Sequence, residues 1–232
     1  MSLIADVECV TFDLDDTLWP VEPVITSAEQ KLYQWLAKHY PRVTERYSLE
    51  ELADKRIDLK NRCVEIAHDV TALRFHSLLQ LAHEFDYEQE LASNGLREFR
   101  LHRNCVEPFA ESEPTLIELA GQFTLGAITN GNAQLEHINI GRYFKFVVTA
   151  EQVGASKPDP KVFQHAVQLA GTTASRLLHV GDCPQSDVLG ALSAGCKSVW
   201  LNADRKPWPG GQNPHAVIHT IGELPHVLVN DK

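Results

Sequence analysis

The sequence contains few cysteines, and their spacing lacks the features of a disulfide framework or a zinc site. Five cysteines occur among 232 residues, so their number is odd, and no two of them form a Cys-x-x-Cys pair. Disulfide frameworks use even numbers of cysteines, and zinc sites commonly pair them at short spacing. We therefore expect five small, reduced thiols, as in a protein of a reducing compartment.

Long apolar runs and a targeting segment are also lacking. No uninterrupted apolar stretch approaches the roughly 18 residues that a membrane-spanning helix needs. The first six residues, Met-Ser-Leu-Ile-Ala-Asp, contain no basic region followed by an apolar one, which a signal peptide would have. These observations predict a cytoplasmic protein with no membrane partner.

A surplus of basic residues is missing as well. The chain has 21 Lys and Arg against 31 Asp and Glu, a formal net charge of −10. Proteins that bind nucleic acids usually present a basic face, so we expect no nucleic-acid partner. Hydrophobic residues make up 44% of the chain and charged residues 22%, which is typical of a folded globular protein.

Glycine is almost missing from residues 20–106, where Gly95 is the only one. Apolar residues recur there at helical spacing, for example Leu32, Trp35 and Leu36. Ser48 and Glu51 match the capping box that begins a helix. This region is predicted to be an all-helical block.

The rest of the chain alternates between β-rich and helical segments. Such alternation predicts a parallel sheet with helices on both faces, an α/β fold of the Rossmann-like, doubly wound type. Residues 1–19 and 107–232 would form this core, and residues 20–106 would be inserted after its first strand. The predicted strands are residues 8–13, 123–129, 146–149, 177–180 and 198–201, and the predicted helices are 114–120, 133–140, 160–170 and 186–194.

Polar side chains follow the ends of four predicted strands. They are Asp13 and Asp15, then Thr129 and Asn130, then Lys157 after a short loop, and finally Asp182 and Asp187. Each alone could be a helix cap, a turn former or a solvated surface residue. Ligands bind beyond the carboxyl ends of parallel strands, and all these residues fall on that edge, which together indicates a functional site.

The residue types at this edge suit phosphoryl transfer. One carboxylate can attack phosphorus, and a second can protonate the leaving oxygen and then activate water. Clustered carboxylates repel one another, and Mg²⁺, which prefers oxygen ligands, would offset that repulsion. The Lys157 ammonium and donors at Thr129 and Asn130 would hold the phosphoryl oxygens.

These residues together resemble the four motifs of the haloacid dehalogenase-like hydrolases. The matching segments are Asp13-x-Asp15-x-Thr17, Thr129-Asn130, Lys157-Pro158 and Gly181-Asp182-x-x-x-x-Asp187. The resemblance implies that Asp13 is the nucleophile and Asp15 the general acid/base, and that Thr129, Asn130 and Lys157 bind phosphate. It further implies that Asp13, the Asp15 carbonyl and Asp182 bind Mg²⁺, with Asp187 doing so directly or through water. The helical block resembles the C1-type cap of that superfamily.

Asp15 favours a phosphatase, because the dehalogenase members lack the second aspartate and a halide leaves without a proton. A 2-haloacid dehalogenase, a phosphomutase and a non-catalytic protein that binds a phosphate ligand remain alternatives.

A finer resemblance, through His68-Asp69-Val70-Thr71 and the segment Ile128–Gln134, is to a bacterial subgroup that hydrolyses flavin mononucleotide and the phosphorylated ribityl-aminouracil precursor of riboflavin. Arg74, Phe75 and His76 are candidates for substrate contact from the cap, with Phe75 expected in the cap's own core. The expected partner is a small phosphorylated molecule, and the expected state is a monomer or weak homodimer.

Overall fold

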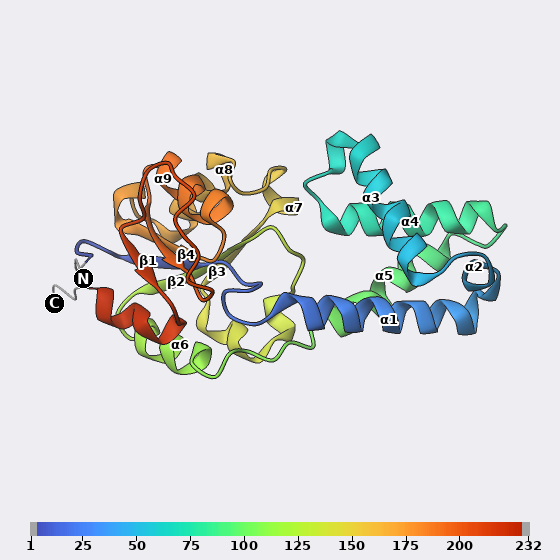
Figure 1. Ribbon diagram of the computed structural model, residues 1–232, viewed down its shortest axis with the longest axis horizontal. Helices are drawn as coiled ribbons and strands as arrows, with labels where there is room; N and C mark the ends of the chain where they lie inside the picture. Colours follow the sequence, from blue (N-terminus) through green and yellow to red (C-terminus); the bar gives the residue numbers. More distant parts are fainter. Residues whose placement is uncertain (1–3, 229–232) are drawn as a thin grey trace. The chain divides into compact units, whose positions relative to one another are not determined.

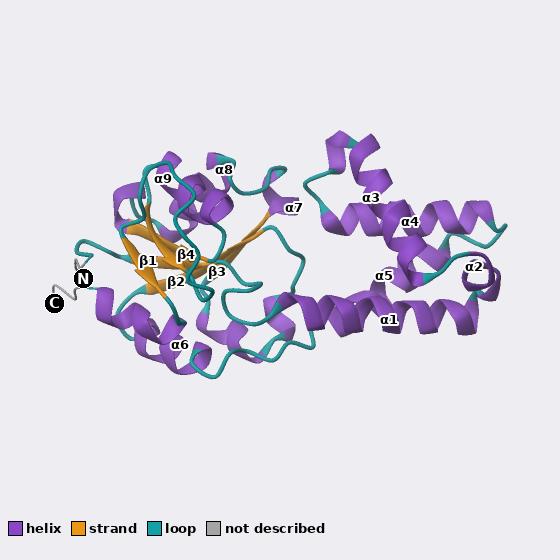
Figure 2. Cartoon of the chain, in the orientation of Figure 1, coloured by secondary structure: helices purple, strands orange, loops and turns teal. Residues whose placement is uncertain are grey.

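The computed structural model describes residues 4–228, and their centre is a six-stranded parallel sheet in the order β3-β2-β1-β4-β5-β6. Figure 2 shows these strands with helices around them. The predicted α/β fold is confirmed, and the five predicted strands lie within one residue of the observed ones. The strands are β1 (Cys9–Phe12), β2 (Thr124–Thr129), β3 (Phe146–Thr149), β4 (Leu177–Gly181), β5 (Lys197–Leu201) and β6 (Ala216–Ile218).

Helices cover both faces of this sheet. The strands β1 and β4 are buried along their whole length, as expected for a sheet covered on both sides. In Figure 1, α8 and α9 lie on one face and α6 lies on the other. The helical segments of this part are α6 (Ser112–Ala120), α7 (Ala150–Val153), α8 (Pro160–Ala170), α9 (Gly190–Ser193), the 3-10 segments η2 (Leu135–His137), η3 (Asn139–Tyr143), η4 (Ala174–Arg176) and η6 (Ile221–Val227), and the π-helical turn η5 (Pro184–Leu189).

The strand order reverses direction at β1. From β1 the chain moves to β2 and β3 at one edge, and it then returns to place β4 on the other side of β1. The register pairs Phe12 with Ala127 on one side and with Val180 on the other. A parallel sheet has a crevice where its strand order reverses, at the carboxyl ends of the two strands concerned. Here that crevice lies at the ends of β1 and β4.

A second compact unit contains Val21–Val106 together with Asn132–Gln134, while the α/β unit holds the remaining described residues. All regular elements of this second unit, the helical unit, are helices, and the capping box at Ser48 and Glu51 is confirmed. Its core is built from aliphatic residues of several helices, such as Leu32, Leu78 and Leu91. Its segments are α1 (Val21–His39), α2 (Pro41–Arg46), α3 (Leu49–Arg62), η1 (Val64–Ile66), α4 (Val70–Glu84) and α5 (Glu90–Arg103).

The helix predicted for residues 133–140 is wrong. The segment 132–134 packs with the helical unit instead, where the Gln134 N–H donates to Asn104 Oδ1 over 2.9 Å. In place of the predicted α-helix, the structure has only the short 3-10 segments η2 and η3 after residue 134. Gly141 lies within η3. It allows a close backbone approach, because a Cβ at this position would lie 1.9 Å from the Leu135 carbonyl oxygen.

The helix predicted for residues 186–194 is also not a single α-helix. A π-helical turn occupies Pro184–Leu189, and α9 begins only at Gly190. Such wide turns are common at functional sites.

Among residues 4–228, no helix is both long enough and apolar enough to span a bilayer.

Candidate active site

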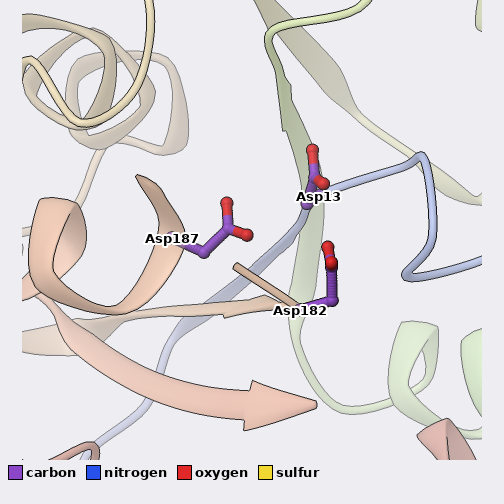
Figure 3. Close-up of side chains that lie close together, drawn as sticks. All are labelled: Asp13, Asp182 and Asp187. Carbon is purple, nitrogen blue, oxygen red and sulfur yellow. The ribbon is translucent and has the colours of Figure 1, made fainter. Parts of the chain in front are cut away.

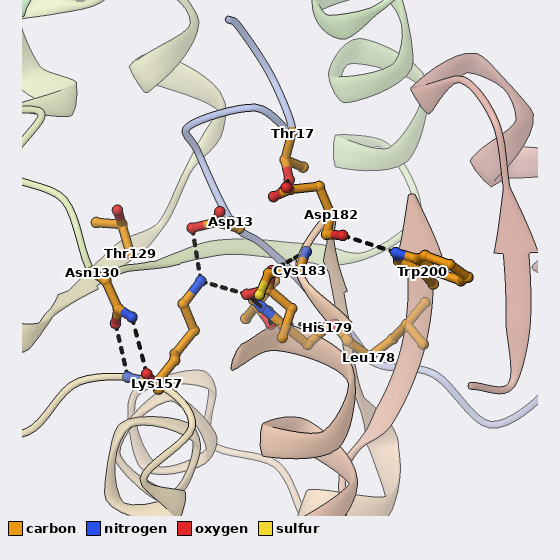
Figure 4. Close-up of polar contacts among 12 residues, drawn as sticks. Asp13, Thr17, Thr129, Asn130, Lys157, Leu178, His179, Asp182, Cys183 and Trp200 are labelled. Atoms are coloured by element: carbon orange, nitrogen blue, oxygen red, sulfur yellow. Dashed lines mark hydrogen bonds and ion pairs between the residues drawn. The ribbon is translucent and has the colours of Figure 1, made fainter. Parts of the chain in front are cut away.

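Lys157 lies at the centre of the residues gathered at the ends of β1 and β4 (Figure 4). Its side chain is 2% exposed, and its Nζ donates to Asp13 Oδ1 over 2.7 Å and to Asp187 Oδ1 over 2.6 Å. A buried ammonium is unfavourable unless it is paired, and here two carboxylates pair with it. Burial alone would lower the pKa of Lys157, but Asp13 and Asp187 outweigh that effect and raise it, so the side chain is a fixed cation.

Three carboxylates lie close together beside this cation, as Figure 3 shows for Asp13, Asp182 and Asp187. One oxygen from each lies within 4.8 Å of the others. Asp13 follows β1, and its N–H donates to the Val180 carbonyl of β4 over 2.8 Å. Asp182 directly follows β4. The reversal of strand order therefore brings residues from distant parts of the sequence into one cluster.

Crowding and burial disturb the titration of these carboxylates. Burial raises the pKa of Asp13 to about 8, and the neighbouring Asp187 carboxylate adds to this rise although Lys157 opposes it. Burial and Asp187 also raise the pKa of Asp182 to about 6. One ammonium therefore does not balance the negative charge of the cluster. A further cation beside Asp13 and Asp182 would balance the remaining negative charge.

Asp187 is the most strongly held of the three. Its Oδ2 accepts the Cys183 N–H over 2.9 Å, across the π-helical turn. Burial alone would raise its pKa, but Lys157 and His179 outweigh this and hold the pKa well below its usual range. Gly181 makes the placement possible, because a Cβ there would lie 2.3 Å from the Asp187 carboxyl carbon.

His179 contacts Asp187 through a hydrogen bond. It is a residue of β4 that the sequence motifs do not include. The ring is fully buried, with Nε2 lying 3.2 Å from Asp187 Oδ1 and Nδ1 lying 3.0 Å from Thr11 Oγ1. Burial lowers the pKa of His179, which favours the neutral form of the ring. Since a carboxylate only accepts, we place a proton on Nε2, which donates to Asp187 Oδ1. The Thr11 hydroxyl lies beside Nδ1 and also donates to the Leu178 carbonyl over 3.3 Å. The only signal in the sequence is a histidine inside an apolar strand.

Asn130 fixes the main chain of Lys157. Its Oδ1 accepts the Lys157 N–H over 2.7 Å, and its Nδ2 donates to the Lys157 carbonyl over 3.0 Å. Thr129, the last residue of β2, is 2% exposed, and its hydroxyl oxygen accepts the Gly131 N–H over 2.9 Å. The end of β2 is therefore joined to the Lys157 loop by a reciprocal pair of hydrogen bonds.

Two tryptophans, Trp19 and Trp200, donate hydrogen bonds to aspartates of the site. The sequence motifs include neither tryptophan. The Trp19 indole Nε1 donates to Asp15 Oδ1 over 2.9 Å. The Trp200 indole Nε1 donates to the Asp182 carbonyl over 2.8 Å. The Thr17 hydroxyl also donates to Asp182 Oδ1, over 3.4 Å. Buried indole N–H groups need acceptors, and here both of these groups find them at the active-site loops.

The donor set suits a hard divalent cation. Asp13 and Asp182 offer carboxylate oxygens, which such cations prefer, and the excess negative charge described above favours one there. The ligand oxygens of Asp13, Asp182 and Asp187 lie within 4.8 Å of one another. Both oxygens of Asp187 already accept hydrogen bonds from Lys157, His179 and Cys183.

Arg74, Phe75 and His76 are the predicted substrate contacts of the helical unit. Two of them, Arg74 and Phe75, make contacts within the unit itself. Arg74 is 7% exposed and donates to both oxygens of Glu29, over 2.7 and 3.1 Å, with its guanidinium stacked on Phe99. Phe75 packs against the core of this unit, as expected.

Comparisons with known proteins agree with the motifs. A family model described as haloacid dehalogenase-like hydrolase matches residues 7–195. A relative from Escherichia coli (strain K12), 5-amino-6-(5-phospho-D-ribitylamino)uracil phosphatase YigB, is 32% identical over 230 residues, covering 96% of each chain. Glyceraldehyde 3-phosphate phosphatase from Methanopyrus kandleri is 28% identical and covers 83% of each chain.

A solved structure is similar over nearly its whole length. It is a crystal structure described as 2-haloacid dehalogenase from Pseudomonas syringae pv. Tomato DC3000, with a TM-score of 0.90, 39% identity, and coverage of 95% of this chain and 97% of that one. The family model covers most of the chain, and the four motifs meet in one site. The chain therefore belongs to the haloacid dehalogenase-like hydrolases.

Proposed function

We propose that this enzyme hydrolyses small phosphomonoesters through a phosphorylated Asp13. The observation that carries the proposal is the Asp13 carboxylate at the reversal of strand order, in contact with the Lys157 ammonium, with a second carboxylate two residues later at Asp15. An anionic phosphoryl group needs both a nucleophile and fixed positive charge to meet it.

The proposed reaction has two steps. First, an Asp13 carboxylate oxygen attacks phosphorus, the bond from phosphorus to the ester oxygen breaks, and Asp15 gives that oxygen a proton, so that an alcohol leaves. Then water attacks phosphorus of the aspartyl phosphate while Asp15 accepts a proton from the water. The bond from phosphorus to the Asp13 oxygen breaks, which restores the Asp13 carboxylate and releases inorganic phosphate. Both carboxyl groups return to their starting protonation states, which balances the cycle.

Phosphate binding is assigned to Thr129, Asn130 and Lys157. The Lys157 ammonium is fixed by its ion pairs and lies beside the nucleophile, so it can neutralise charge on the phosphoryl oxygens without reorganising. The Thr129 hydroxyl accepts from Gly131, which leaves its proton to donate. The reciprocal bonds of Asn130 to Lys157 keep the two loops together.

Mg²⁺ is the proposed cofactor, held by Asp13, the Asp15 carbonyl and Asp182. When bound, it would neutralise charge on the phosphoryl oxygens and on the carboxylate cluster. We assign Asp187 to the metal through water, because Lys157, His179 and Cys183 already occupy its oxygens.

The helical unit is proposed to act as a cap, since its chain follows directly on the loop that carries Asp13 and Asp15. A cap would exclude water from the phosphorylated intermediate.

Dehalogenation is the competing function, because the solved structure that matches at 39% identity is described as a 2-haloacid dehalogenase. Asp15 argues against it for this chain. A halide ion departs without a proton, so dehalogenation gives a second aspartate nothing to protonate. The Asp15 carboxylate is nevertheless held in a defined position by Trp19.

The finer proposal is that the substrate carries a phosphorylated ribityl chain, as flavin mononucleotide and 5-amino-6-(5-phospho-D-ribitylamino)uracil both do. The support is the relative from Escherichia coli, whose name states the second of these substrates and which matches almost end to end.

Replacing the nucleophile tests the mechanism. In Asp13→Asn, turnover of a phosphomonoester should fall at least about 10³-fold, because an amide is a poor nucleophile and cannot form the acyl phosphate. Asp54→Asn makes the same charge change on the exposed face of α3 and should leave turnover unchanged. Steady-state kinetics with both variants make the measurement, and near-normal turnover by Asp13→Asn would contradict the proposal.

Magnesium binding can be tested without activity. Mg²⁺ at about 100 times its dissociation constant should stabilise the folded enzyme by about 2.7 kcal/mol, because it binds the folded carboxylate cluster. In Asp182→Asn this stabilisation should largely disappear. Thermal unfolding with and without Mg²⁺ after chelator treatment gives the result, and equal stabilisation of both proteins would reject the assigned site.

A substrate panel tests the finer proposal. The value of kcat/KM should be highest for flavin mononucleotide or the phosphoribitylamino-uracil, and lower for glyceraldehyde 3-phosphate and pyrimidine 5′-nucleotides, which lack the ribityl chain. A 2-haloacid should yield no halide. A preference for a nucleotide or triose phosphate would overturn the ribityl assignment while keeping the phosphatase, and halide release would overturn both.

A further inference from the structure

The loop after β1 folds back so that two of its side chains meet. Asp15 and Trp19 pair as an isolated bridge, and the Asp16 N–H donates to the Trp19 carbonyl over 2.7 Å. Asp16 adopts a left-handed φ of 58°, which turns the chain within a few residues. The Leu18 N–H donates to the Leu14 carbonyl over 2.8 Å and closes the turn. The loop thus brings the Trp19 indole beside the Asp15 carboxylate.

The Trp19 side chain has no room to move. It is fully buried and among the largest buried side chains of the protein. The carbonyl of the preceding residue, Leu18, accepts from the Phe109 N–H over 2.9 Å and from the Ser112 hydroxyl over 2.8 Å, which anchors the loop to the start of α6. A rigid loop and a rigid side chain together set the position of Nε1.

The bond from Trp19 to Asp15 is directional. The indole Nε1 can only donate, and it lies 2.9 Å from Asp15 Oδ1. A buried donor that loses its only partner is costly, so the indole N–H is tied to this acceptor. The bond therefore holds one oxygen of the Asp15 carboxyl at a fixed point.

We propose that Trp19 is a positioning residue for proton transfer by Asp15. This inference rests on the proposed function, in which Asp15 protonates the leaving oxygen. A general acid must lie within hydrogen-bond reach of that oxygen, and small displacements of a reacting group are costly. Trp19 touches no reacting atom and acts by fixing the rotamer of Asp15.

This role predicts a selective defect. An alkoxide is a strongly basic leaving group and needs its proton as the bond to phosphorus breaks, whereas p-nitrophenolate is a weak base and can leave without one. Loss of the indole donor should therefore lower kcat/KM for an alkyl phosphate much more than kcat/KM for p-nitrophenyl phosphate. A general loss of folding or of phosphate binding would reduce both alike.

The experiment compares kcat/KM for glycerol 1-phosphate and p-nitrophenyl phosphate in Trp19→Phe, which keeps an aromatic ring and removes the donor. The constant for glycerol 1-phosphate should fall at least about tenfold more than that for p-nitrophenyl phosphate. Trp200→Phe is the matched control, because its indole holds the Asp182 main chain rather than Asp15, and it should leave the ratio unchanged. Equal losses for both esters in Trp19→Phe would overturn the proposal.

A double variant tests whether Trp19 acts through Asp15. In an Asp15→Asn background, adding Trp19→Phe should produce no further change in the ratio of the two constants. A tenfold further change would show that Trp19 acts by another route and would contradict the inference.

A second measurement covers the case in which Trp19→Phe does not fold. In protein labelled with ¹⁵N-tryptophan, the Trp19 indole N–H resonance should shift in Asp15→Asn, whereas the Trp35 resonance should not. An unchanged Trp19 signal would overturn the inference. If the wild-type enzyme hydrolyses neither ester with Mg²⁺, the proposed function fails, and the Trp19 contact is then judged by this spectrum alone.

Discussion

The ion pairs of one buried lysine organise the active site. Lys157 Nζ lies 2.7 Å from an Asp13 oxygen and 2.6 Å from an Asp187 oxygen, and its side chain is almost fully removed from water. Removing either partner of such a pair would leave an uncompensated buried charge. The surroundings keep all three groups in place: Asn130 holds the Lys157 main chain, and Cys183 and His179 hold Asp187. The Asp13 N–H donates to the Val180 carbonyl. The reversal of strand order at β1 and β4 brings their loops together.

The net charge of −10 is a poor guide to what the site binds. Several of the acidic residues are concentrated where the proposed chemistry uses them as nucleophile, acid/base and metal ligands. Three carboxylates share one ammonium there, and the Asp187 carboxylate adds to the rise that burial causes in the pKa of Asp182, to about 6. A divalent cation and a fixed ammonium would convert this acidic cluster into a site that attracts phosphate.

The sequence was sufficient for five of the six strands of the sheet and for the main residues at its edge, whereas the short edge strand β6 was not predicted. Strand and helix alternation predicts a parallel sheet, and a parallel sheet requires that Asp13, Thr129 and Asp182 follow strand ends on one side. The supporting residues were not predictable in the same way. His179 and Trp19 act through partners chosen by side-chain packing, and a histidine in an apolar strand or a tryptophan in a loop does not reveal its partner. The helix predicted for residues 133–140 is wrong because tertiary contacts outweigh the local pattern at its start, where residues 132–134 bond to Thr71, Arg103 and Asn104 of the helical unit.

The most direct test of the central claim is chemical trapping of the phosphorylated enzyme. The enzyme would be mixed with Mg²⁺ and a ³²P-labelled phosphomonoester and quenched in acid within milliseconds, and the labelled peptides would then be mapped by mass spectrometry. The account predicts a protein-bound label that hydroxylamine releases, as expected for an acyl phosphate, on the peptide containing Asp13. Turnover with no protein-bound label, or with the label on another residue, would contradict it.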